Sequence, residues 1–98
     1  MIQQKNNEYL QTQLQNQLKQ YASQYTFYQN TISYYRSTAI RNAQTIIANA
    51  NKAYQNGEIE YVEYSQALQT NFDIQKAYIE AINNLNQTII SIQFIINQ

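Results

Sequence analysis

The sequence contains no cysteine, proline, histidine or tryptophan, and only one glycine among its 98 residues. Proline and glycine are the usual punctuation of loops, so a β-sandwich or an α/β domain, which needs several tight turns, is not expected. Without histidine or cysteine, the chain has no thiol nucleophile and no imidazole to activate its serines. These absences predict a helical protein that is not an enzyme.

Charge is sparse and balanced. Charged side chains make up 12% of the sequence and cancel, so nothing indicates an electrostatic grip on nucleic acid or anionic lipid. Residues 1–56 hold five basic side chains and one acidic one, whereas residues 57–98 hold five acidic and one basic. Halves of opposite sign would attract each other if folded side by side, although in so short a chain the asymmetry also fits chance.

Long apolar runs are missing as well. No stretch approaches the roughly 20 apolar residues of a membrane helix, and the first residues are too polar for a secretory signal. Asn and Gln supply 30 residues and Tyr supplies ten. We interpret the amides as uncharged polar faces of helices, which suits a surface that meets water without strong charge, such as a channel wall.

Apolar residues recur at helical spacing through the first half of the chain. The steps of three and four average close to the helix period of 3.6, which predicts a helix from about residue 3 to 55. The predicted stripe consists of Leu10, Leu14, Leu18, Tyr21, Tyr25, Tyr28, Ile32, Tyr35, Ala39, Ala43, Ile46, Ala50 and Ala53.

A turn is predicted at residues 55–59, because Asn56-Gly57 ends the periodic pattern. Glycine adopts the left-handed conformation after a helix at little cost. Lys52 before the turn and acidic residues after it suit the dipoles of a helix that ends and another that begins. Because hard cations require about six or more oxygen ligands, Glu58, Glu60 and Glu63 are interpreted as a solvated helix start, with no metal or cofactor expected.

The second half predicts a helix from about residue 60 to 97 with two adjoining apolar stripes. The first stripe is Val62, Leu68, Phe72, Ile79, Ile82, Ile89 and Ile96, and the second is Ala67, Ile74, Tyr78, Ala81, Leu85 and Ile92. A helix in an isolated pair needs only one such seam. We therefore expect an all-α, coiled-coil-like antiparallel hairpin, a single domain or a fragment over residues 1–98, that packs into a larger helical bundle.

The two predicted helices differ in length. The first would overhang the second by a dozen or so residues at about 1.5 Å per residue. A break between residues 30 and 40, where β-branched Thr31 and Ile32 occur, is another way to absorb the mismatch and would give three helices.

The residues around the turn resemble the TolC-like outer-membrane efflux proteins. From Ala50 to Leu68 the sequence reads AxxxYxxGEIxYxEYxQAL, and Tyr78 to Ile90 reads YIEAINNLNQTII. The stretch from Tyr34 to Ile96 is most similar to the TolC-like C-terminal part of heavy-metal efflux pumps of the resistance-nodulation-division class, the CusA/CzcA type. Ile40-Arg41 departs from that family, in which many members have Leu-Pro at this place.

The resemblance implies a role and a location. Such hairpins assemble, normally as trimers, into a tunnel across the periplasm, and their tips meet a periplasmic adaptor or the inner-membrane pump. This chain would then be a periplasmic fragment of an outer-membrane-associated complex, without the strands of a membrane pore. By position, the contact surface at the tip would consist of Gly57, Glu58, Ile59, Glu60, Tyr61, Val62, Glu63 and Gln66.

A different class of function stays open on the residues alone. The same pattern fits a freestanding coiled-coil scaffold that self-associates through its broad apolar face. Partners are therefore expected to be copies of the chain or other helices of a parent protein, together with the adaptor and pump if the resemblance holds. Neither nucleic acid nor membrane insertion is expected.

Overall fold

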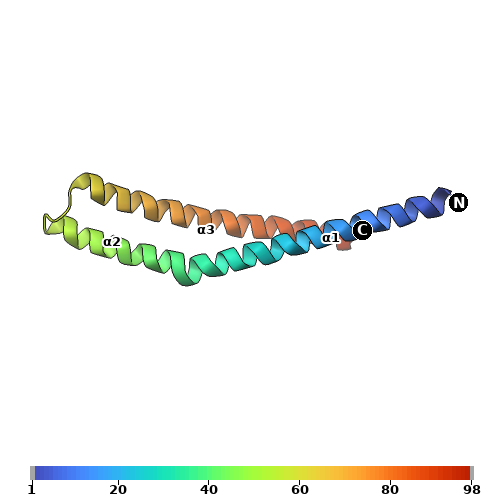
Figure 1. Cartoon of the computed structure of the whole chain (residues 1–98), viewed down its shortest axis with the longest axis horizontal. Coiled ribbons are helices and arrows are strands. Elements are labelled where there is room, and N and C mark those ends of the chain that lie inside the picture. Colours follow the sequence, from blue (N-terminus) through green and yellow to red (C-terminus); the bar gives the residue numbers. More distant parts are fainter. Residues whose placement is uncertain (1, 98) are drawn as a thin grey trace.

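The computed structural model describes residues 2–97, with side-chain burial described from residue 6 onward, and shows an extended antiparallel hairpin of helices (Figure 1). One arm consists of α1 (Ile2–Tyr34), the short element η1 (Tyr35–Ala39) and α2 (Ile40–Gln55); the other is α3 (Tyr61–Ile96). The molecule measures 80 × 21 × 16 Å. The predicted all-α hairpin is confirmed.

One stripe of α3 faces the other arm along its whole length. Its residues follow one another in alternating steps of three and four, the spacing of a coiled-coil seam, and none of them is exposed. We call these residues the α3 seam: Tyr64, Ala67, Asn71, Ile74, Tyr78, Ala81, Leu85, Thr88, Ile92 and Ile95. The buried Thr88 hydroxyl donates to the Asn84 carbonyl oxygen at 2.9 Å, so its polar group is satisfied. The seam includes all six residues of the second predicted stripe.

The facing arm has a matching seam. From Leu14 the seam follows Leu18, Tyr21, Tyr25, Tyr28, Ile32, Tyr35 and Ala39, and then continues through Ala43, Ile47, Ala50 and Tyr54. The predicted stripe was wrong at two places. Ile46 is 52% exposed and Ile47 faces α3 in its stead, while Leu10 is exposed because α1 there has passed the end of α3 (Figure 1).

The shift from Ile46 to Ile47 originates in η1, which is a single π-helical turn. The Ile40 backbone N–H donates to the Tyr35 carbonyl oxygen, five residues earlier. Such a turn accommodates one residue more than an α-helical turn. Ala39 and Ile40, at the end of this turn, are both half-buried. Beyond this point, the seam runs one residue later than an uninterrupted α-helix predicts.

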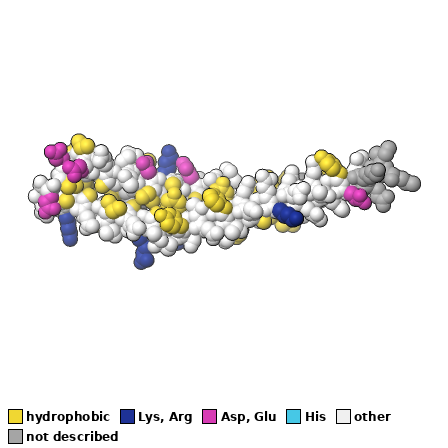
Figure 2. Space-filling view, viewed as in Figure 1, with side chains coloured by type: hydrophobic (Ala, Val, Ile, Leu, Met, Phe, Trp, Pro, Cys, Tyr) yellow, Lys and Arg dark blue, Asp and Glu magenta, His cyan; other side chains and the backbone are white. Residues whose placement is uncertain are grey.

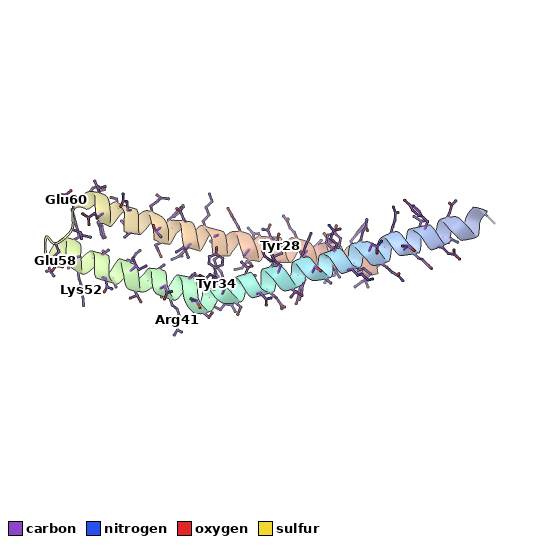
Figure 3. All side chains as sticks on the ribbon, viewed as in Figure 1. Tyr28, Tyr34, Arg41, Lys52, Glu58 and Glu60 are labelled. Carbon is purple, nitrogen blue, oxygen red and sulfur yellow. The ribbon has the colours of Figure 1, made fainter. Side chains whose placement is uncertain are left out.

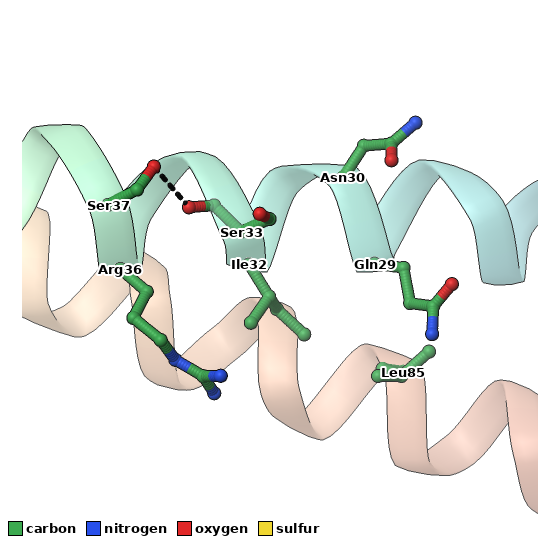
Figure 4. Close-up of a pocket in the computed structure, with 7 residues that line it drawn as sticks. All are labelled: Gln29, Asn30, Ile32, Ser33, Arg36, Ser37 and Leu85. Atoms are coloured by element: carbon green, nitrogen blue, oxygen red, sulfur yellow. Dashed lines mark hydrogen bonds between the residues drawn. The ribbon is translucent and has the colours of Figure 1, made fainter.

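The sequence left open a break between residues 30 and 40 that would give three helices. The structure has the π turn η1 at this place. The arm stays helical through residues 35–39 and bends there (Figure 1). The Ser37 hydroxyl donates to the Ser33 carbonyl oxygen at 2.7 Å (Figure 4), a bond that bends helices. Arg36 reaches toward α3 and donates from Nε and Nη2 to the Tyr78 hydroxyl oxygen, at 3.3 and 3.2 Å. These bonds fix the π turn against α3.

The first predicted stripe of α3 lies largely open to solvent. Val62, Leu68, Phe72, Ile79 and Ile96 are exposed, and Ile82 and Ile89 are half-buried. Large apolar side chains exposed in this number on one helix indicate packing against further helices. The hairpin alone therefore covers only one side of α3. None of the helices in the part of the chain described here is long and apolar enough to cross a membrane.

Candidate docking tip

The end of α2 carries a glycine-terminated helix cap. Gly57 has φ of +75°, its N–H donates to the Tyr54 carbonyl oxygen at 3.1 Å, and the Glu58 N–H donates to the Ala53 carbonyl oxygen at 2.8 Å. This pair of bonds is the Schellman motif, which requires a left-handed residue. No atom lies within 4 Å of a Cβ built on Gly57. Glycine is thus favoured by the backbone conformation and not by lack of space.

The connection then extends into α3 without a side-chain cap. Glu60 is in an extended conformation, φ −87° and ψ 165°, and its carbonyl oxygen accepts the Tyr64 N–H at 3.1 Å. The helix begins at Tyr61, so Glu63 is the acidic residue of its first turn. Glu58 and Glu60 precede the helix, so the expectation that all three acids open it holds for Glu63 alone.

A cluster of three tyrosines joins the two arms just behind the turn. The ring of Tyr54 in α2 stacks on that of Tyr64 in α3, with centroids 4.8 Å apart and planes at 10°. Tyr61 lies against the same Tyr54 ring at 6.3 Å and 59°. Aromatic pairs contribute about 0.5–1.5 kcal/mol beyond the area they bury. The cluster therefore anchors the start of α3 to the end of α2.

Tyr54 was missed as a tip residue in the sequence. The predicted stripe passed through Ala53, which is half-buried, and left out its neighbour Tyr54, whose ring stacks on Tyr64 although the residue is 41% exposed. A seam that runs through Ile47 continues at Ala50, three residues later, and at Tyr54, four residues after that. This spacing is the signal that identifies Tyr54.

The structure brings the predicted contact residues together at the end of the hairpin remote from both chain ends (Figure 1). Tyr61 and Val62 are 67% and 61% exposed, and Ile59 is half-buried. The others are all exposed: Gly57, Glu58, Glu60, Glu63 and Gln66. Gln66 lies one turn further along α3, on the same helix face as Glu63.

Acidic and apolar groups are thus presented side by side. Figure 2 shows acidic side chains gathered around this end of the molecule, next to hydrophobic ones, and Figure 3 shows Glu58 and Glu60 on either side of the turn. Within the described part of the chain, no three carboxylates come together in a way that would hold a metal ion. The tip therefore presents exposed carboxylates and exposed apolar side chains on one end of the molecule.

Comparison of the chain with protein-family models, with curated proteins and with solved structures finds no match.

Proposed function

We propose that this hairpin is a periplasmic segment of a TolC-like efflux tunnel in heavy-metal export. Its sides contribute to the tunnel wall and its tip docks to the adaptor or the pump of the resistance-nodulation-division class. The proposal rests on the resemblance over Tyr34–Ile96, and the structural observation that supports it is the exposed tip. Tyr61, Val62 and Glu63 stand open to solvent there although they adjoin a well-anchored turn.

The rigidity of the tip suits docking. The Schellman motif and the stack of Tyr54 on Tyr64 hold the backbone in place, so little conformational freedom remains to be lost on binding. The exposed carboxylates give long-range attraction to a basic partner. The amide-rich outer faces of the arms suit a wall that meets water.

Charge reversal at the tip tests this proposal. We expect Glu63→Lys to weaken binding to the purified periplasmic adaptor of a CusA/CzcA-type pump. The measurement is the affinity of the chain for adaptor immobilised on a sensor surface. Glu8→Lys is the matched control, because Glu8 is an exposed acid on α1, far from the turn. Helicity measured by circular dichroism should be the same in both variants. Equal binding by both variants, or no binding by the unaltered chain, would refute tip docking.

A self-associating scaffold is the second candidate, favoured by the open apolar stripe of α3. It predicts a defined oligomer from the chain alone and no binding of the adaptor. Solution mass measured by light scattering, together with the adaptor experiment, separates the two functions.

A further inference from the structure

The side chains of this protein that an oxidant attacks most readily are its tyrosines. In most proteins, cysteine and methionine take up oxidants first. This sequence has no cysteine, no tryptophan and no histidine, and it has one methionine against ten tyrosines. One-electron oxidation of the chain therefore falls mainly on phenol rings.

Three pairs of tyrosine rings lie against each other in the part of the chain that the structure describes. Tyr34 and Tyr35 meet edge to face, with centroids 5.7 Å apart and planes at 70°. Tyr54 and Tyr61 are 6.3 Å apart, with planes at 59°. Tyr54 and Tyr64 are the closest of the three pairs, at 4.8 Å, and the one with nearly parallel planes, at 10°.

The stack of Tyr54 on Tyr64 suits the coupling of two phenol rings. A ring that loses one electron and its phenolic proton becomes a phenoxyl radical, whose unpaired electron is shared with the ring carbons ortho to the oxygen. Two such radicals combine by forming a bond between ortho carbons. An offset stack holds the ring carbons of one tyrosine over those of the other, whereas a tilted or edge-on pair does not.

The backbone at the turn keeps the two rings together. The Tyr54 carbonyl oxygen accepts the Gly57 N–H, and the Tyr64 N–H donates to the Glu60 carbonyl oxygen, both at 3.1 Å. Tyr54 is 41% exposed, so an oxidant in solution reaches its ring. Tyr64 is half-buried, and the phenol ring against it is that of Tyr54.

We propose that Tyr54 and Tyr64 form a site of oxidative modification, at which a one-electron oxidant of the peroxide-derived or high-valent metal class joins the two arms by a dityrosine bond. Two electrons pass to the oxidant and two phenolic protons pass to water. The new bond connects an ortho carbon of each ring. The hydrogen of each of these carbons then moves to the phenol oxygen of its own ring, so both rings become aromatic again and the product has lost two hydrogen atoms.

Such a bond takes the place of the disulfide that a chain without cysteine cannot form. It closes a loop over residues 54–64, which contains the whole turn, and so restricts the unfolded chain as a disulfide does. The exposed side chains of the tip are left unchanged. The modification therefore does not depend on whether the tip docks to a partner.

Peptide mapping of the oxidised chain tests the site. The full chain, diluted so that few molecules meet, is oxidised by photolysis of ruthenium(II) tris(bipyridine) with persulfate. Cleavage after Lys, Arg and Glu then gives the fragments 53–58, 61–63 and 64–76, each of which contains one tyrosine. We expect the main cross-linked product to be fragment 53–58 joined to fragment 64–76, two hydrogen atoms lighter than their sum and with the blue fluorescence of dityrosine.

Two variants separate the effect of the stack from that of exposure. Tyr64→Phe keeps a ring against Tyr54 but removes its phenol, and should abolish this product. Tyr61→Phe is the matched control and should leave the product unchanged, although Tyr61 is the more exposed ring, at 67%. Coupling of Tyr54 mainly to Tyr61, cross-links spread over the tyrosines according to exposure, or cross-links between chains alone would contradict the proposal.

Unfolding in urea provides a second measurement. The oxidised chain should unfold at a higher urea concentration than the unoxidised chain, because the bond restricts the unfolded state. Tyr64→Phe treated with the same oxidant should not show this shift. An unchanged or lowered midpoint in the cross-linked chain would mean that the bond distorts the turn, and that the stacked arrangement is not the one that couples.

Discussion

Removing one residue from the π turn should leave the hairpin intact. We expect deletion of Thr38, which is exposed, to convert residues 35–40 into ordinary α-helix. Ile40 then takes the seam place of Ala39, and Ala43, Ile47 and the residues beyond keep their contacts with α3. No seam contact beyond the turn is lost, so the free energy of unfolding should stay within about 1 kcal/mol of that of the unaltered chain.

Deletion of Asn83 from α3 is the matched control. Asn83 is exposed, like Thr38, but α3 has no π turn to absorb the change. The deletion rotates the following residues by about 100°, so that polar Asn86 and Gln93 replace half-buried Leu85 and Ile92 in the seam. Full burial of such a side chain contributes about 1.5–3 kcal/mol, so losing two half-buried ones should cost about 2 kcal/mol.

Urea unfolding followed by circular dichroism at a fixed protein concentration measures both deletions. A loss of about 2 kcal/mol corresponds to at least about 8 °C in melting temperature for a chain of this size. The two variants are therefore easily separated. If deleting Thr38 destabilises the hairpin as much as deleting Asn83, the π turn does not accommodate an extra residue and the account of the seam is wrong.

Three smaller changes probe the turn and the contacts between the arms, each measured by the same unfolding experiment. Gly57→Ala should cost about 1 kcal/mol, because its φ of +75° disfavours any Cβ; no loss would mean that the turn relaxes freely. Tyr54→Ala should cost about 1–2 kcal/mol through the lost stack on Tyr64, and more than Tyr61→Ala, whose ring is more exposed; the reverse order would refute the anchoring role. Tyr78→Phe removes the acceptor of both bonds from η1 and should cost about 0.5 kcal/mol, and a larger loss would show a tighter coupling than this exposed contact implies.

The hairpin and its turn were predictable because local chemistry specifies them. Gly57 is the only glycine, and it follows Asn56, which also favours helix ends. The spacing of apolar residues on both sides of the turn has the helix period. The second stripe of α3 was correctly predicted because Ala81, Leu85 and Ile92 alternate with polar residues at regular spacing.

The π turn was not predictable in the same way. Steps of three and four both fit a helix, so Ile46 and Ile47 were equally acceptable seam residues until the arm was seen to gain a residue at η1. Ala39 and Ile40 are both apolar, which conceals the extra residue in the sequence pattern. Tyr54 was missed for the same reason. The sequence also does not show which of the two α3 stripes packs against the other arm, because apolar residues occur on both faces of the helix. The structure was needed to decide this.

The path of the chain gives the hairpin a mechanical direction. The free ends of α1 and α3 lie on the side away from Gly57 (Figure 1), so a pull on them opens the arms one seam layer at a time, starting near Leu14 and Ile95. The tyrosine cluster is the last layer to separate. A load applied between the tip and the free ends instead acts along both helices together and opens no layer before the others. The same molecule is therefore weak when unzipped and stiff along its length, the combination expected of a strut.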